Sequence, residues 1–373
     1  MNKLLLISAL CAVLAGCGDK TENGDTAKNS ADNKLNIYNW SDYIAEDTIA
    51  NFEKETGIKV VYDVYDSNEM LEAKLLPGAS GYDVVFPSAR PFAEKQVTAG
   101  VYGDLDKTQL ANWGNNDAQI LKSLAAIDPG NAKLAPYMWG TTGIGINVKK
   151  VREILGPDAP LDSWSLIFDP AISGKLAQCG IGVLDDPEDS FTSALLWKGM
   201  DPGVSDAAAL AAIKDAYLAT RPNIKYFHSS QYISDLANGD VCMAMGYSGD
   251  VFQARDRAEE AKNGVEIAFI IPKEGAALWV DVMAVPADAP HKANAMKFIN
   301  YLMKPDVAAS ISNYVSYATP NTAATQFLDP ELAADKSIYP DADIKARLVD
   351  PPTFPQDIQR ERVRLWTTIK TGK

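Results

Sequence analysis

The sequence has little histidine and little cysteine, and its longest apolar run is short. Only His228 and His291 occur among 373 residues, and they lack the spacing of a metal-ligand set. We therefore expect no metal centre, no cofactor and no histidine-based catalytic triad. The apolar run at residues 4–15 is shorter than the roughly 20 residues that a membrane-spanning helix needs.

Positive charge is also scarce. The chain has 35 Lys and Arg residues against 49 Asp and Glu residues, a formal net charge of -14. Residues 1–16 contain one basic residue, Lys3, and no acidic residue, so their removal would change the net charge from -14 to -15. A chain this acidic is a poor candidate for binding nucleic acid or an anionic membrane, and it is compatible with a cationic ligand.

The N-terminus has the pattern of a lipoprotein export signal. Residues 1–16 combine a basic start, an apolar run and small residues, and Cys17 follows. The stretch Leu14-Ala15-Gly16-Cys17 resembles a bacterial lipobox, which implies cleavage before Cys17 and lipid on its sulfur. Residues 17–33 are polar and predict a flexible tether. We expect contact with a membrane only through the lipid anchor, and simple secretion is the alternative.

Cysteine use fits an oxidising compartment. Cys11 would leave with the signal and Cys17 would be the anchor, so Cys179 and Cys242 remain. Such a remaining pair is expected to form a disulfide outside the cytoplasm.

Length and pattern predict an α/β protein with two domains. About 340 residues remain after the signal and tether, more than one hydrophobic core usually holds. Strands predicted at 35–38, 58–65 and 82–86 alternate with helices, which favours a doubly wound sheet. The glycine-rich stretch 140–145 is a plausible crossing between two lobes.

The end of the first predicted strand carries the most distinctive side chains. Trp40, Ser41, Asp42 and Tyr43 place two rings, a hydroxyl and a carboxylate in one turn. Ligands of open α/β sheets bind beyond the carboxyl ends of strands, and rings and carboxylates both attract cations. An ordinary strand-to-helix turn with aromatic core residues explains this stretch equally well on its own.

Three later stretches have similar chemistry. Residues 247–250 repeat the aromatic, hydroxyl and carboxylate set, and strand alternation places Trp279 and Asp281 on one face. A carboxylate within an apolar strand is costly unless it is paired. Residues 185–189 contain four carboxylates before a helix expected near Ser190, and spacing alone favours a dipole-stabilised helix start over a cage for an ammonium group.

Four stretches together, 38–44, 82–88, 221–230 and 271–275, resemble the periplasmic polyamine-binding proteins of bacterial ABC importers. The resemblance extends over essentially the whole chain after the signal. It implies the type II solute-binding fold, in which two α/β lobes, each a mixed sheet flanked by helices, are joined by a hinge. We expect lobe 1 at 34–139 plus about 262–312 and lobe 2 at 140–261 plus about 313–373. In this likeness Cys179 and Cys242 correspond to the family's disulfide.

The resemblance also implies a ligand site. A polyamine is a hydrocarbon chain with ammonium groups at fixed separations, so it needs rings along its length and acids at its ends. The family's aromatic box corresponds to Trp40, Tyr43, Tyr247, Trp279 and Tyr317. Its ammonium-binding acids correspond to Asp42, Asp250 and Asp281, with a further acid at Glu188 or Asp189, and its hydroxyl contacts to Ser41, Ser88 and Ser229.

Departures from the family pattern bear on the preferred polyamine. Tyr247 stands where similar putrescine binders usually have Trp, and Trp279 and Asp186 are similar to the spermidine-preferring relatives. Asp42 is similar to the putrescine pattern. Arg90 would repel an ammonium group, so we expect it at the rim, paired with an acid. On balance these residues weakly favour spermidine as the predicted ligand, with putrescine as the close alternative.

The resulting expectation is a periplasmic, monomeric binding protein rather than an enzyme. It would capture a polyamine and deliver it to the membrane permease subunits of an ABC importer. One alternative is a secreted hydrolase that uses a carboxylate pair such as Asp250 and Asp281. Another is a solute-binding protein for a different cationic metabolite. Turnover of a bound substrate would distinguish the hydrolase.

Overall fold

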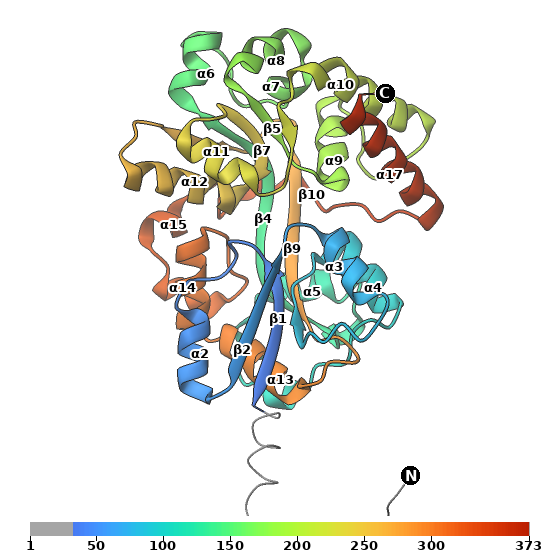
Figure 1. The fold of residues 1–373 in the computed structure, drawn as a ribbon, viewed down its shortest axis with the longest axis vertical. Helices are drawn as coiled ribbons and strands as arrows, with labels where there is room; N and C mark the ends of the chain where they lie inside the picture. The colour runs from blue at the N-terminus through green and yellow to red at the C-terminus, as the bar shows by residue number, and fades with distance from the viewer. Residues whose placement is uncertain (1–32, 373) are drawn as a thin grey trace, which may run out of the picture.

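The computed structural model describes residues 33–372, which form two lobes stacked along the long axis of the molecule (Figure 1). The predicted signal, most of the tether and the lipidation site Cys17 lie outside the described residues. The fold is the expected α/β arrangement with mixed sheets flanked by helices.

The first lobe is built on three parallel strands. In it, β1 (Lys34–Trp40) pairs with β2 (Lys59–Tyr65) on one side and with β3 (Val84–Val85) on the other. The intervening helix α2 (Thr48–Thr56) ends at Gly57, which adopts the left-handed φ of 72° that favours glycine. The other helices of this lobe are α3 (Asn68–Leu75), α4 (Glu94–Thr98), α5 (Ala118–Leu124), α13 (Lys292–Leu302) and α14 (Pro305–Val315).

Two long central strands run from one lobe into the other (Figure 1). The 14-residue strand β4 (Leu134–Asn147) pairs antiparallel with β9 (Ala276–Ala284) through its first half. Its second half pairs with β7 (Met243–Tyr247) and β8 (Ile267–Ile270). The glycine-rich stretch lies in this strand, and a Cβ on Gly143 would stand 2.5 Å from the Ile270 carbonyl oxygen. The predicted crossing therefore exists as a continuous strand whose glycines allow close packing.

The second lobe continues the sheet through β7, β5 (Ile181–Val183) and β6 (Tyr226–Phe227), which are parallel to one another. Its core includes the buried rings of Trp164, Phe191 and Tyr217. Its helices are α6 (Val148–Leu155), α7 (Ser165–Phe168), α8 (Pro170–Leu176), α9 (Pro187–Trp197), α10 (Ala207–Thr220), α11 (Gln231–Asn238), α12 (Ser248–Ala261) and α17 (Gln356–Thr371).

The last part of the chain passes between the lobes. After α14 it forms α15 (Pro330–Ala334) and α16 (Ala342–Lys345). The two-residue strand β10 (Leu348–Val349) then pairs with β9, and α17 packs against α9 and α10. The C-terminal segment thus runs beside the central strands before it joins the second lobe.

The hydrophobic cores support a revised division of the chain near residue 276. Ile267, Phe269 and Ala276 pack in the core of the second lobe, whereas Trp279 packs in the core of the first. The sequence-based division placed residues from about 262 to about 312 in lobe 1. We propose instead that lobe 1 resumes after residue 276, because β8 completes the sheet of the second lobe beside β4.

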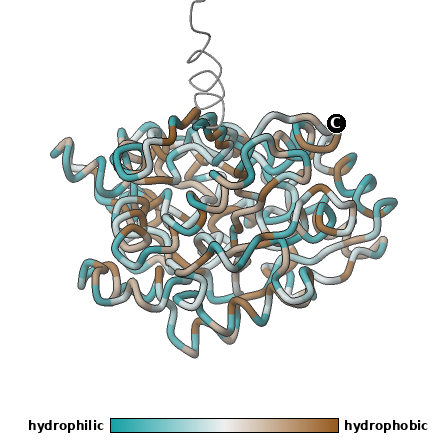
Figure 2. Tube along the Cα trace, turned by 90° about the horizontal axis from the view of Figure 1, so that it is seen from below, coloured by the Kyte–Doolittle hydropathy of each residue, from teal (hydrophilic) through white to brown (hydrophobic). Residues whose placement is uncertain are grey.

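Hydrophobic stretches run through the middle of the Cα trace, and hydrophilic stretches are frequent at its periphery (Figure 2). In the part of the chain that is described, no helix is both long and apolar enough to cross a membrane.

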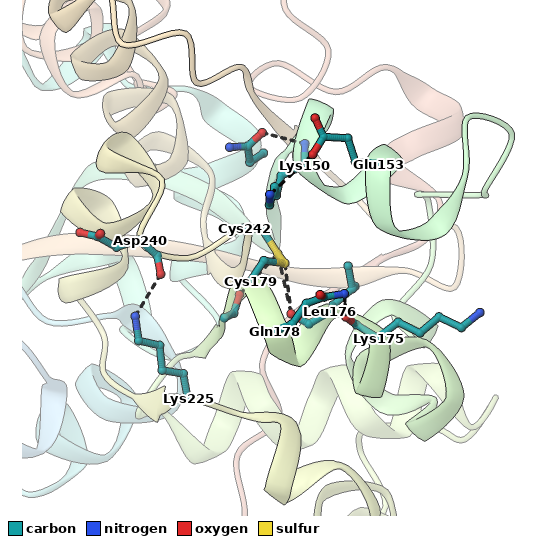
Figure 3. The surroundings of a disulfide bond; sticks show 11 residues. Lys150, Glu153, Lys175, Leu176, Gln178, Cys179, Lys225, Asp240 and Cys242 are labelled. Carbon is teal, nitrogen blue, oxygen red and sulfur yellow. Dashed lines mark hydrogen bonds and ion pairs between the residues drawn. A yellow bond between two sulfur atoms is a disulfide. The ribbon is translucent and has the colours of Figure 1, made fainter.

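Cys179 and Cys242 form the expected disulfide (Figure 3). It joins the short 3-10 turn Ala177–Cys179 to the residue before β7, and Cys242 is buried. The bond closes a segment with a sequence separation of 63 residues, which contains α9, α10 and α11.

Candidate ligand-binding cleft

A cleft with about 710 Å³ of space between protein atoms, part of it open to solvent, lies between the lobes. All of the ligand residues expected from the sequence line it except Asp42. They come from strand ends and helix starts of both lobes and from β9, so the topology brings together residues far apart in the sequence. The expected residues on its wall are Trp40, Ser41, Tyr43, Ser88, Asp186, Glu188, Asp189, Ser229, Tyr247, Asp250, Trp279, Asp281 and Tyr317.

Aromatic rings form a connected wall in this cleft. The Trp279 ring meets the Tyr247 ring edge-on at 5.6 Å between centroids and the Tyr317 ring at 5.3 Å. Tyr317 in turn meets Tyr43 edge-on at 5.1 Å. Such edge-to-face pairs hold one another in place. The wall offers a rigid surface to a methylene chain or a cation.

Asp281 is the buried carboxylate that the sequence singled out as costly. It lies in β9 with 5% of its surface exposed, and its Oδ1 accepts a hydrogen bond from Ser88 Oγ at 2.7 Å. Burial raises the pKa of Asp281 to about 7, although the hydrogen bond from Ser88 lowers it. No Lys or Arg within residues 33–372 forms an ion pair with Asp281. Its charge therefore lacks a compensating cation from the described chain.

Asp250 occupies the first turn of α12 and lines the same cleft. It accepts hydrogen bonds from Tyr317 Oη at 2.6 Å and from Tyr232 Oη at 2.7 Å. Burial raises the pKa of Asp250 to about 6, and the two tyrosine hydrogen bonds oppose this rise. The tyrosines thus fix the direction of the carboxylate without supplying a positive charge.

The helix carrying the acidic stretch begins at Pro187, three residues earlier than the sequence predicted. Asp186 is its N-cap and accepts hydrogen bonds from the backbone N–H groups of Glu188 and Asp189 at 2.8 and 3.0 Å. Burial raises the pKa of Asp186 to about 6, and burial followed by the Asp186 charge raises the pKa of Asp189 well above its usual value. Thr142 donates to Asp189 at 2.8 Å. The helix-start interpretation of Asp186 is therefore correct, and these acids also face the cleft.

Glu188 differs from its neighbours because its carboxylate is already paired. Arg362 Nη2 lies 2.9 Å from Glu188 Oε2, and the Gln359 amide donates to Oε1 at 2.5 Å. Both partners come from α17, and Arg362 and Glu188 are both buried.

Asp42 lies next to the cleft but does not line it. Its backbone has a left-handed φ of 53°, and its carboxylate accepts a hydrogen bond from Arg257 Nη2 at 2.8 Å. Arg90 lies at the cleft wall and pairs with Asp350 at 3.3 Å, which agrees with the expected rim position.

Several lining residues were missed by the sequence reasoning. Asn68 was not among the expected ligand residues, yet its side chain donates to Ser88 Oγ and accepts from the Ser88 backbone N–H, both at 3.1 Å. Its position after a strand was the available signal. Pro351 had no recognisable signal, because the return of the C-terminal segment to the cleft is a property of the whole fold. The missed lining residues are Asp66, Asn68, Pro91, Phe92, Ser230 and Pro351.

Across residues 33–372, no group of three or more His, Cys, Asp or Glu side chains is arranged to hold a metal ion. Carboxylates without cationic partners beside aromatic faces complement an organic cation instead, since both groups attract ammonium nitrogen.

Known proteins that are similar to this chain include binding proteins for organic cations, in agreement with the chemistry of the cleft. Residues 47–340 match the family model described as bacterial extracellular solute-binding protein. The chain is 54% identical over 340 residues to the putrescine-binding periplasmic protein PotF of Escherichia coli, covering 91% of this chain and 92% of that one. It is 51% identical over 373 residues to the putrescine-binding periplasmic protein SpuD of Pseudomonas aeruginosa, covering 100% and 99%. A solved structure of a putative spermidine/putrescine ABC transporter from Listeria monocytogenes superposes with a TM-score of 0.81 at 31% identity, over 91% of this chain and 100% of that one.

Proposed function

The chain belongs to the family of bacterial extracellular solute-binding proteins, and we propose that it captures putrescine in the periplasm and delivers it to the membrane subunits of an ABC importer. The observation that carries this proposal is the position of Asp281 and Asp250 beside a connected wall of rings, since neither of these two buried carboxylates forms a direct ion pair within residues 33–372.

Putrescine has two ammonium groups separated by four methylene groups. In the proposed complex one ammonium group binds at Asp250 and Asp281, and the other lies toward Asp186 and Asp189 at the start of α9. The methylene groups lie along the ring of Trp279. Since residues from both lobes contact the ligand, binding favours the closed arrangement, which the membrane subunits would recognise.

The similar proteins favour putrescine over the spermidine that the sequence leaned toward. Two relatives with 54% and 51% identity are named putrescine-binding, whereas the relatives named spermidine/putrescine-binding are 35% identical. The preference for spermidine inferred from the sequence depended on Tyr247, Trp279 and Asp186. Asp186 has a structural reason to be acidic, because it caps α9.

A related cation is the second candidate. Relatives named putrescine/agmatine-binding and putrescine/cadaverine-binding are 40% and 36% identical to the chain. Membership of a family described as solute-binding argues against the hydrolase alternative.

Two further properties belong to this proposal. We propose that Cys17 is lipidated after signal cleavage, so that a Cys17→Ser variant appears in the soluble periplasmic fraction while the wild type stays with membranes. We also propose that the protein acts as a monomer, because residues from its own two lobes form the wall of the cleft.

Titration calorimetry of the purified protein tests the ligand assignment. Copurified ligand is first removed by unfolding and refolding, and putrescine, cadaverine, agmatine and spermidine are then titrated separately. We expect one-to-one binding with putrescine tightest. Absence of heat with all four would overturn the polyamine assignment, and tighter binding of spermidine would restore the sequence-based preference.

A further inference from the structure

The C-terminal helix places a buried cation directly behind the cleft. Arg362 of α17 is 1% exposed, although arginine is seldom fully buried. Its guanidinium lies between two aromatic rings, 4.3 Å from the centroid of Phe354 and 4.9 Å from that of Phe191. Its charge is directed at one acceptor, Glu188, whose side chain lines the cleft.

Stability alone is a weak explanation for this ion pair. Two charges removed from water lose hydration, and replacing such a pair by apolar side chains is often neutral or stabilising. Arg362 also uses little of its hydrogen-bonding capacity, since its Nε and Nη1 atoms have no hydrogen-bond partner among the described residues. The position of Arg362 is thus better explained by its contact with Glu188 than by the packing of α17.

We propose that Arg362 is a positioning residue that masks the charge of Glu188 and thereby sets the net charge of the cleft at the start of α9. The inference rests on the proposed function. Three acidic side chains, Asp186, Glu188 and Asp189, stand at this end of the cleft. With Arg362 and Gln359 occupying both Glu188 oxygens, two of the three carboxylates remain for an ammonium group.

The number of unpaired carboxylates at this end of the cleft affects the preference between putrescine and spermidine. The attraction between a ligand and the cleft scales with the product of their charges, so an additional carboxylate favours a trication more than a dication. Masked Glu188 thus favours putrescine relative to spermidine. In this view Glu188 is not an ammonium ligand, in contrast to the role that the family resemblance implied.

Competitive titrations of putrescine and spermidine at pH 8 test the inference. In Arg362→Met the carboxylate of Glu188 is exposed to the ligand, and we expect the ratio of spermidine to putrescine affinity to increase at least tenfold. Arg362→Lys retains a cation and should stay within threefold of the wild-type ratio. A structural role alone would lower the melting temperature and weaken both ligands alike. An unchanged ratio in Arg362→Met would overturn the inference.

Two further variants make the test independent of folding defects. Arg364→Met removes the same charge from an exposed position of α17 and should leave the ratio unchanged. An equal shift in that variant would mean that the overall charge of the helix matters, which contradicts masking. Glu188→Gln combined with Arg362→Met leaves no unpaired buried charge, so the ratio of spermidine to putrescine affinity should return to within threefold of the wild-type ratio. A tenfold loss of putrescine affinity in the double variant would show that Glu188 contacts the ligand itself.

The same experiment separates the two proposals. If the wild-type protein binds no polyamine, the proposed function fails. If it binds putrescine and the ratio does not respond to Arg362, only the masking inference fails.

Discussion

Asp42 and Arg257 join the two lobes beside the cleft, with Arg257 Nη2 2.8 Å from Asp42 Oδ1. Asp42 follows β1 in the first lobe, and Arg257 lies on α12 in the second. Both side chains are about two-fifths exposed, at 41% and 42%. An ion pair this accessible to water is weak. Because its two members belong to different lobes, it would break if the lobes moved apart, and it would then stabilise only the closed arrangement.

We therefore predict a small effect for Asp42→Asn. Asn tolerates the left-handed backbone at this position, and an exposed pair contributes roughly 0.2–1 kcal/mol. Putrescine affinity should fall by no more than about fivefold, and the difference should vanish at high salt because exposed charges are screened. Titrations at low and high ionic strength measure this. Asp256→Asn, one residue before Arg257, is the matched control. A loss of tenfold or more in Asp42→Asn would show direct contact with ligand, as the sequence suggested.

Asp281→Asn should have a far larger effect on binding. Removing one partner of a buried charge pair typically costs roughly 2–5 kcal/mol, so we expect putrescine affinity to fall by a factor of about 30 or more. The ligand-free variant should melt at the same temperature as wild type or higher at pH 8, because a buried uncompensated charge is removed. Calorimetric titration and thermal melting together measure both effects.

The exposed Asp162 provides the control for this variant, since it pairs only loosely with Lys273 at 3.6 Å. Asp162→Asn should bind like wild type. Binding by Asp281→Asn within threefold of wild type would remove Asp281 from the ligand site.

The raised pKa values predict that binding depends on pH. In the ligand-free protein the pKa of Asp281 is about 7, and those of Asp250 and Asp186 are about 6. Putrescine ammonium groups, like that of lysine, stay protonated up to about pH 10 and favour the ionised carboxylates. Affinity should therefore rise at least tenfold from pH 5 to pH 8, and protons should be released on binding near pH 6–7. Titrations in buffers with different ionisation heats measure the released protons, and an affinity that is flat over this range would contradict the assignment.

The stability of the ligand-free protein should change with pH in the opposite direction to the affinity. These carboxyl pKa values lie above the value of about 4 in an unfolded chain, so the folded state binds more protons between pH 4 and 7. The free energy of unfolding of the empty protein should fall as pH rises through this range and then level off. Saturating putrescine should reduce or reverse this fall. Chemical unfolding at pH 5 and pH 8, with and without ligand, measures both.

The features that the sequence predicts correctly are those set by local residue patterns. β1 and β2 match the predicted strands closely, and alternation placed Trp279 and Asp281 on one face of β9, where both line the cleft. The start of α9 was misplaced because Pro187 was not used as a helix start, although proline fits the first turn, where its missing N–H costs nothing.

The features that the sequence could not predict depend on contacts between residues far apart in the chain. Arg362 lies 174 residues from Glu188, and no local pattern indicates that the two charges meet. Likewise Asp42 carries the residue type of a ligand acid, but its direction depends on one left-handed backbone angle and on a cation from the other lobe. At these positions the sequence shows which side chains have suitable chemistry, but only the folded structure shows where those side chains point.

The disulfide should stabilise the second lobe with little effect on ligand affinity. Cys179 and Cys242 close a loop with a sequence separation of 63, and the chain-entropy model gives about 4 kcal/mol for a loop of this size. Neither cysteine lines the cleft. Cys179→Ser combined with Cys242→Ser should therefore melt at a clearly lower temperature while binding putrescine within threefold of wild type at 15 °C. Reducing agent should lower the melting temperature of wild type in the same way and leave the double variant unchanged. A large loss of affinity in the folded double variant would instead mean that the disulfide holds α9 and α12 in position for the ligand.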